Sequence, residues 1–388
     1  MLSSDMSSIN PQQMARRPAV VLVTLVILAI LGFSLVRHLV NRFGEQRKAL
    51  SRHLYQRSLT EQRRGDSQGA IADLRSALDY DPDNFQYQLS LARLLRDSGN
   101  IPEAETYLVN LWERDPQNGA VNLALARLFA RQHLTQKAIQ YYHNAMYGVW
   151  GNDSDGERES IRLETVHYLI GEKAFPDAQA ELISWTAVLP ANSELRLTLA
   201  ELFAEAQDYE HALEQYRQVL RHSKKAAALV GAGKVAYQLG HYRTAQNYLT
   251  EAARAEPQNK EIKQMLDTSS AVLDADPFMR RISSKERNRR AESALAVSGK
   301  RLQDCAAARK IDLSAASNTA GLTPLYQRWL ALKSKERKIT PANAADARDS
   351  MMDLVFDIEQ QTQSICGAPV GKDEALLLLS QNPLGVDR

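Results

Sequence analysis

A repeat with a period of about 34 residues, the length of one helical hairpin, restricts the fold of this chain more than any other feature of its sequence. Alanines mark it at nearly equal intervals, with one longer interval in the middle of the series. They are Ala70, Ala104, Ala138, Ala178, Ala212 and Ala245. A small residue at the same place in each period is expected where two helices cross closely, because a larger side chain would separate them. The period therefore predicts a stack of helical hairpins.

Other positions of the period agree with paired helices. Residues four and seven positions after each alanine fall on one helical face, as Leu108 and Leu111 do after Ala104. Glycines that can adopt a left-handed turn between the paired helices are Gly65, Gly99 and Gly240. Prolines that end a unit are Pro82, Pro116, Pro190 and Pro257. The longer interval, from Ala138 to Ala178, predicts a loop at positions 148–158, which are rich in Gly, Asn and Asp.

This pattern resembles the tetratricopeptide repeat (TPR) family, with about six helix–turn–helix units over residues 37–270 once a basic segment after residue 36 is included. The early tryptophan of the family is missing, and the first unit is either a cap or a continuation of the preceding helix. The resemblance implies a superhelix whose concave face is lined by the first helix of each pair. It also implies that this face holds an extended peptide or a helix of a partner protein.

The resemblance places four arginines on the inward face. Arg93 and Arg127 are one period apart and so occupy equivalent places, and Arg96 and Arg131 lie one turn further along. Planar guanidinium groups can bind a carboxylate through paired hydrogen bonds, which predicts a partner with an acidic segment or a carboxyl terminus. The alternative is that these are solvated surface charges balanced by Asp97 and nearby acids.

Acidic residues follow on a later unit. Glu201 and Glu205 occupy corresponding places there, so the predicted groove is basic at one end and acidic at the other. Gly231 and Gly233 resemble a phosphate-binding loop, but they lie within a predicted repeat helix. A dinucleotide fingerprint needs a preceding strand, so these glycines indicate close helix packing.

An uncharged apolar stretch occupies positions 18–36, after an N-terminal tail of residues 1–17. As a helix it is about 28 Å long, close to the hydrocarbon thickness of a bilayer. A cleaved signal peptide is the alternative, but its apolar region is usually about 7–15 residues and ends at a small-x-small site. The segment therefore predicts a retained anchor that spans the lipid bilayer once.

The sequence gives conflicting indications of the side of the membrane on which the large domain lies. More Lys and Arg follow the segment than precede it, which places the large domain in the cytoplasm, although long domains translocate largely regardless of charge. The two cysteines of the chain suit one disulfide outside the reducing cytosol. These observations conflict, and we favour the periplasmic side; the resemblance to single-span bacterial TPR proteins implies a bacterial inner membrane.

The carboxyl-terminal region, residues 271–388, predicts a small helical domain. Its helices are expected at residues 284–310, 322–338 and 341–365, followed by a flexible tail from residue 381. Cys305 and Cys366 fall near the ends of two of these helices. They form either a disulfide that locks the helices together or two unpaired core thiols.

Sequence motifs for chemistry are missing. The formal net charge of +2 is too balanced for a dedicated nucleic-acid binder. The eight histidines are scattered, and H-E-x-x-H, C-x-x-C, G-x-S-x-G and Walker A patterns do not occur. We therefore expect no enzyme activity, cofactor or metal. The sequence predicts a membrane-tethered scaffold or adaptor that recruits partner proteins, in envelope assembly or secretion; the alternative is a permanent structural or assembly subunit of a larger membrane complex.

Overall fold

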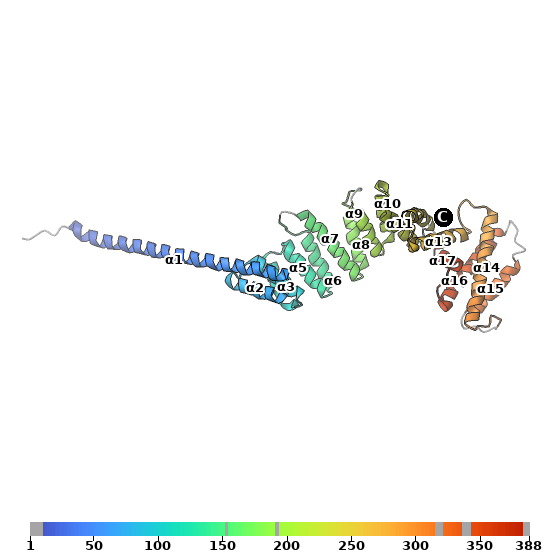
Figure 1. Cartoon of the computed structure of the whole chain (residues 1–388), viewed down its shortest axis with the longest axis horizontal. Helices are drawn as coiled ribbons and strands as arrows, with labels where there is room; N and C mark the ends of the chain where they lie inside the picture. Colours follow the sequence, from blue (N-terminus) through green and yellow to red (C-terminus); the bar gives the residue numbers. More distant parts are fainter. Residues whose placement is uncertain (1–10, 152–153, 191–193, 315–320, 336–342, 383–388) are drawn as a thin grey trace, which may run out of the picture. The chain divides into compact units, whose positions relative to one another are not determined.

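The computed structural model describes residues 11–151, 154–190, 194–314, 321–335 and 343–382, and regular structure in them is α-helical (Figure 1). An isolated bridge joins Asn118 and Val149. The all-α class is confirmed. The chain divides into two compact units, Met1–Thr165 and Val166–Arg388, each considered by itself below. Most of the predicted N-terminal tail and the last residues of the predicted C-terminal tail lie outside the described part.

The first unit is built from helical hairpins. Its helices are α1 (Pro11–Arg63), α2 (Ser67–Tyr80), α3 (Phe85–Asp97), α4 (Ile101–Arg114), α5 (Gly119–Arg131), α6 (Thr135–Met146) and the larger part of α7 (Ser154–Gly171). Helix α1 packs against α2, α3 against α4, and α5 against α6. Each pair is joined by a short turn, which makes its two helices antiparallel neighbours.

Helix α1 belongs both to the apolar segment and to the first hairpin. It has 53 residues and is therefore about 80 Å long. Its last turns pack against α2, where Ser51, Leu54 and Ser58 are buried. The apolar side chains with a described surface between Leu22 and Val36 are exposed. Of the two alternatives for the first unit, the structure shows the continuation of the preceding helix.

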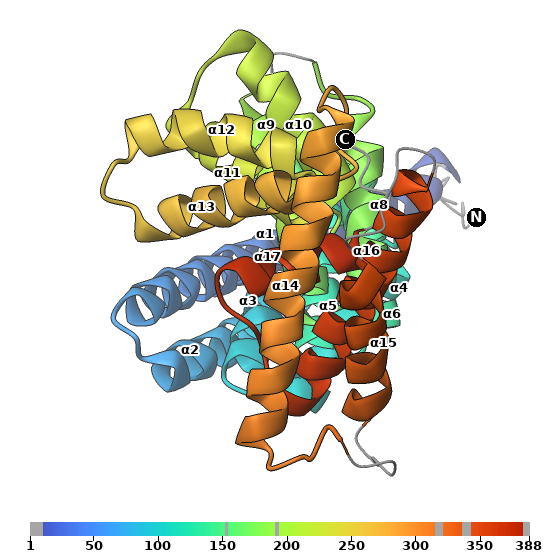
Figure 2. The same cartoon turned by 90° about the vertical axis from the view of Figure 1, so that its right-hand side faces the viewer.

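The second unit contains the remaining helices. They are α8 (Phe175–Thr186), α9 (Leu195–Glu205), α10 (Tyr209–His222), α11 (Ala226–Gln238), α12 (Tyr242–Ala255), α13 (Lys260–Ala275), α14 (Ser284–Ala308), α15 (Leu322–Lys335), α16 (Ala344–Cys366) and α17 (Lys372–Gln381). Helices α11, α12 and α13 pack side by side (Figure 2). Helices α14 to α17 share an apolar core with Tyr242 of α12 and Val272 of α13.

The repeat positions behave as their spacing predicts. All six marker alanines have 0% exposed surface, which confirms that they lie at close helix crossings. The asparagine two residues after a proline caps the next helix, as Asn84 does by accepting a hydrogen bond from the Tyr87 backbone N–H. Asn118 and Asn259 do the same in their units. Proline and asparagine together thus end one hairpin and begin the next.

The turns between paired helices are left-handed whether or not glycine is present. Gly65, Gly99 and Gly240 have φ values of 81°, 86° and 72°, as predicted. The equivalent positions of the other units are His133, Lys173 and Gln207, with φ values of 56°, 58° and 60°. The hairpin geometry therefore imposes a left-handed backbone even on residues for which it is unfavourable.

The loop predicted over residues 148–158 is partly wrong, because α7 begins at Ser154. The residues before α7 are held by hydrogen bonds to the preceding hairpin. The Val149 N–H donates to the Gln117 carbonyl at 2.7 Å. The Trp150 indole donates to the Ala145 carbonyl at 2.7 Å and lies against Gly119, where a Cβ would approach its ring to 2.2 Å. Residues 152–153 of this stretch lie outside the described part.

The carboxyl-terminal helices follow the prediction with one omission. Helices α14, α15 and α16 lie within about three residues of the expected bounds, and residues 336–342 lie outside the described part. Helix α17, KDEALLLLSQ, was not predicted. Its buried Leu376 and Leu379 complete the core with α14 and α16. The predicted domain boundary between residues 270 and 271 stays a prediction.

Candidate functional site

Three of the predicted arginines are electrostatic neighbours in the first unit. Arg93 and Arg96 lie on α3, and Arg127 lies on α5. Burial lowers the pKa of Arg93, and the positive charges of Arg127 and Arg96 lower it further. A pKa lowered in this way means that the protonated guanidinium is held without full compensation. We call these three residues the arginine cluster.

Arg127 is already engaged within the fold. Its Nε and Nη2 donate to the two carboxylate oxygens of Glu164 on α7, each at 2.7 Å. The Tyr142 hydroxyl donates to Glu164 Oε1 at 3.0 Å. Burial alone would raise the pKa of Glu164, but the hydrogen bonds and the charge of Arg127 lower it overall. Glu164 is therefore an ionised carboxylate at neutral pH, bound on both oxygens.

Arg96 is only partly satisfied. Its Nε and Nη2 contact Asp97 Oδ1 at 2.9 Å and 2.8 Å. Its Nη1 is buried and has no hydrogen-bond partner among the described residues. A buried charged donor without a partner is costly unless something else satisfies it.

Arg93 is half-buried, and the positive charges of both Arg127 and Arg96 act on it. Within the described ranges no hydrogen bond or ion pair to its guanidinium is found. Tyr55 of α1 is among the groups that act electrostatically on Arg93 and stacks on Tyr87 with ring centroids 4.7 Å apart. The cluster thus offers one cation and one extra donor beside an aromatic pair.

Arg131, the fourth predicted arginine, lies at the exposed end of α5. It is not among the residues that shift the pKa of Arg93. The structure therefore brings Arg93, Arg96 and Arg127 together, and Arg131 stays a separate predicted contact.

The predicted acidic residues belong to the second unit. Glu201 and Glu205 are exposed on α9. Burial raises the pKa of Tyr216, and the two glutamates raise it further. The Tyr216 ring lies against Gly231 of α11, where a Cβ would be 2.2 Å from Cζ. This confirms that Gly231 serves close helix packing; the predicted groove with a basic and an acidic end stays a prediction.

Sequence reasoning missed Glu164 and the hydrogen bond of the Tyr142 hydroxyl. The longer interval before the fourth unit shifts its register, so Glu164 falls at no repeat position that Arg127 would suggest. Tyr142 fits the repeat as a core residue, which hides its hydroxyl. A search for acidic residues about one repeat after each inward arginine is the signal that would have found Glu164.

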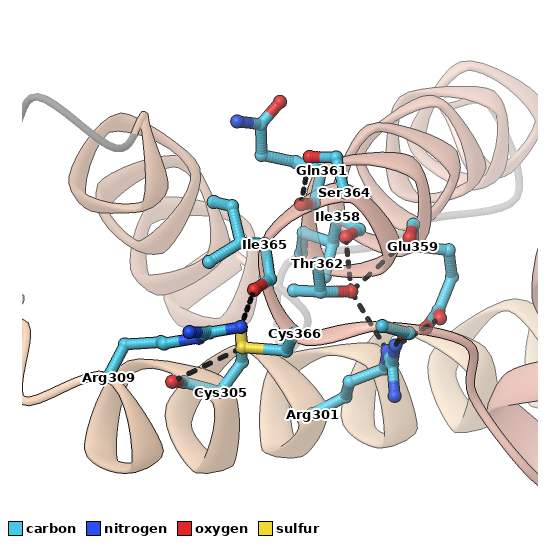
Figure 3. Close-up of a disulfide and its surroundings, with 11 residues drawn as sticks. Arg301, Cys305, Arg309, Ile358, Glu359, Gln361, Thr362, Ser364, Ile365 and Cys366 are labelled. Carbon is cyan, nitrogen blue, oxygen red and sulfur yellow. Dashed lines mark hydrogen bonds and ion pairs between the residues drawn. A yellow bond between two sulfur atoms is a disulfide. The ribbon is translucent and has the colours of Figure 1, made fainter.

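A second charged cluster lies in the carboxyl-terminal helices, beside a disulfide between Cys305 and Cys366 (Figure 3). Their Cα atoms are 5.9 Å apart, and the bridge joins α14 to α16. Arg301 donates to Thr362 Oγ1 and to the Gly367 carbonyl, each at 2.9 Å. Together with a hydrogen bond from Arg309 to the Ile365 carbonyl, these contacts fix the end of α16.

Glu359 is a fully buried member of this cluster, with 0% exposed surface. Its Oε2 is 3.3 Å from Arg301 Nε, yet neither oxygen has a hydrogen-bond partner in the described chain. Burial raises the pKa of Glu359 to about 8, and Asp373 of α17 raises it while Arg301 lowers it. This arrangement favours a protonated carboxyl near neutral pH.

A metal site and a membrane-spanning helix are two further features that the sequence analysis addressed. Among the described residues, no group of three or more His, Cys, Asp or Glu is placed to hold a metal ion. One helix in the described part, Thr24–Arg63 within α1, is long and apolar enough to cross a membrane, with a mean hydropathy of 1.8 in its most apolar window.

Two segments match family models described as tetratricopeptide repeat, residues 62–128 and residues 197–240. The chain therefore contains tetratricopeptide repeats, which confirms the repeat predicted from its spacing. Proteins with this repeat are typically non-catalytic scaffolds for protein–protein interaction.

Similarity to individual proteins is distant. The DnaJ homolog subfamily C member 3 homolog of Dictyostelium discoideum is 28% identical over 109 residues, which is 28% of this chain and 22% of the relative. This chain thus spans about a fifth of the length of that relative. PilF of Pseudomonas aeruginosa is 20% identical with a TM-score of 0.36, over 56% of this chain and 97% of PilF. PilW, a type IV pilus biogenesis factor, is 19% identical with a TM-score of 0.35, over 56% of this chain and 98% of PilW.

Proposed function

We propose that this protein is a membrane-tethered scaffold that binds partner proteins through its tetratricopeptide repeats. The first unit supplies the contact, and Arg93 and Arg96 bind an acidic segment or the carboxyl terminus of the partner. Tethering raises the local concentration of that partner at the membrane.

The observation that carries this proposal is the charge on Arg93. Its guanidinium is half-buried, burial lowers its pKa, and no carboxylate among the described residues forms an ion pair with it; the charge of Asp97 offsets the shift only in part. The unused Nη1 of Arg96 belongs to the same cluster. A carboxylate from outside the chain supplies both the missing charge and the missing acceptor.

Binding of a labelled peptide tests the contact. The probe is a fluorescein-labelled hexapeptide with a free carboxyl terminus, titrated with the full chain in detergent and followed by fluorescence anisotropy. We expect Arg93→Glu to weaken binding by about tenfold or more, because it replaces a charge-assisted contact with repulsion. Arg114→Glu is the matched control, with the same charge change at an exposed position at the end of α4, and is expected to leave affinity within about threefold. Equal losses in both variants would reject the proposed contact.

The tether is the apolar part of α1. The side chains of Leu28 and Leu31 are 65% and 60% exposed, which is unfavourable in water and favourable in a bilayer. Substitution of both by Arg should move the protein from the membrane pellet to the supernatant after carbonate extraction. The intact mass of the purified protein distinguishes a retained anchor from a cleaved signal peptide.

We place the two units on the periplasmic side of a bacterial inner membrane. The disulfide between Cys305 and Cys366 supports this side, because such bonds persist outside the reducing cytosol. In spheroplasts, a maleimide reagent that cannot cross membranes should label these cysteines only after external reduction. Labelling that needs lysis but no reductant would place the domain in the cytoplasm.

Sizing of the solubilised protein separates the adaptor from a permanent subunit. An adaptor should elute mostly free of partners, whereas a subunit should elute in a stable stoichiometric complex.

A further inference from the structure

The charges of the arginine cluster do not balance. Three guanidinium groups, of Arg93, Arg96 and Arg127, face two carboxylates, of Asp97 and Glu164. One positive charge therefore lacks a counter-ion among the described residues. Because Arg127 and Glu164 neutralise each other, the excess charge lies on the side of α3.

Glu164 occupies the Nε–Nη2 edge of Arg127 and neutralises its charge. The pair is bidentate, with both distances at 2.7 Å, and the Tyr142 hydroxyl holds Glu164 from a third direction. The side chains remain 40% and 29% exposed, so the pair borders on solvent. A ligand carboxylate that approached Arg127 would either displace Glu164 from this edge or bind the Nη1 donors beside the negative charge of Glu164.

The donors that carry the excess positive charge belong to Arg93 and Arg96. The Arg93 guanidinium has no partner among the described residues, and Arg96 Nη1 is buried without one. These donors, with one excess charge, suit one carboxylate.

Building on the function proposed above, we infer that Glu164 is a specificity-determining residue: by occupying Arg127 it restricts the cluster to a partner segment that presents a single carboxylate at this point. A second carboxylate on the ligand brings no gain in affinity, because the cation that would bind it is already paired.

Two peptides of equal size test this inference. They share one neutral sequence and end in asparagine or in aspartate, so they present one or two carboxylates at the carboxyl terminus. With the wild-type chain, anisotropy titrations should give affinities within about threefold of each other. In Glu164→Gln, Arg127 is free, and the aspartate peptide should bind about tenfold more tightly than the asparagine peptide. Glu113→Gln removes an exposed glutamate of α4 and should keep the wild-type ratio.

A double variant provides a second test in case Glu164→Gln does not fold. Arg127→Gln with Glu164→Gln removes the whole ion pair without a change in net charge. It should bind the asparagine peptide within about threefold of the wild type, since Arg127 does not contact the ligand. A tenfold loss, or an unchanged peptide ratio in Glu164→Gln, would overturn the inference. Failure of both peptides to bind the wild-type chain would instead reject the proposed function and the inference with it.

Discussion

A comparison of one Arg–Glu pair from each unit shows how burial decides whether the carboxylate of such a pair stays charged. Arg127 and Glu164 lie 2.7 Å apart with side chains 40% and 29% exposed. Arg301 and Glu359 lie 3.3 Å apart with side chains 14% and 0% exposed. In the first pair the pKa of Glu164 is lowered, and in the second burial raises the pKa of Glu359 to about 8.

The difference separates a binding surface from a structural core. The solvent beside the first pair lets a ligand reach the cluster around it, and its carboxylate stays charged. The second pair is closed off by α14, α16 and α17 and stands beside the disulfide. There a charged carboxylate is unfavourable, so the protonation state of Glu359 is linked to folding.

Removal of the two arginines should give the largest contrast. Arg301 contacts Glu359, Thr362 and the Gly367 carbonyl, so Arg301→Gln should lower the free energy of unfolding of the second unit by about 3 kcal/mol. Arg127→Gln should cost the first unit about 1 kcal/mol, because its pair is open to solvent. Urea unfolding followed by hydrogen exchange in each unit measures both. Similar losses of unfolding free energy in the two units would contradict the proposed difference between the pairs.

The pH dependence of stability should have opposite signs in the two units. Glu359 has a folded pKa of about 8 against an ordinary value of 4.5, so the folded state binds the extra proton. Its contribution is complete below pH 4.5 and is lost as pH rises toward 8; we expect a loss of about 2–4 kcal/mol by pH 9. Glu164, with its lowered pKa, contributes above its ordinary pKa and loses its contribution as pH falls.

Glu359→Gln isolates the first of these effects. It keeps the size of the side chain and cannot ionise, so the second unit should lose most of its fall in stability toward pH 9. Glu164→Gln should leave that alkaline loss unchanged. A loss at high pH that persists in Glu359→Gln would assign it to another group.

The smallest effects should come from the left-handed turns. Lys173 and Gln207 are exposed and have φ values of 58° and 60°. Each substitution by glycine should raise the free energy of unfolding by about 0.5–1 kcal/mol, because glycine adopts this backbone without a steric penalty. Gly99→Ala is the reverse control and should cost about 1 kcal/mol, since a Cβ there meets no atom within 4 Å and only the backbone is strained. Peptide affinity should not change in any of them.

The sequence predicted what depends on spacing. The marker alanines are spaced by the size of a hairpin, so they indicate the stack, and the step of one period from Arg93 to Arg127 puts both on equivalent faces. The contact of Glu164 could not be predicted, because the insertion before α7 shifts the register of the repeat. The left-handed positions of His133, Lys173 and Gln207 escaped because tertiary geometry, and not residue type, imposes them.

The carboxyl-terminal region shows the same limit. Helices α14 to α16 carry long apolar faces, whereas α17 has 10 residues and follows Gly371 without a side-chain cap. Such a short helix gains its stability from packing against α13, α14 and α16, which local sequence does not report. The raised pKa of Glu359 comes first from its burial and then from the charge of Asp373 on α17, and neither could be predicted from the local sequence.

A double-mutant cycle between Arg93 and the carboxylate of a bound peptide tests the central claim most directly. The four affinities are those of the wild type and Arg93→Gln for one peptide with a free carboxyl terminus and for the same peptide with a terminal amide. The account predicts a coupling free energy of about 1.5–3 kcal/mol, the range of a hydrogen bond to a charged group. A coupling of zero, with both peptides weakened equally, would show that Arg93 does not bind the carboxylate.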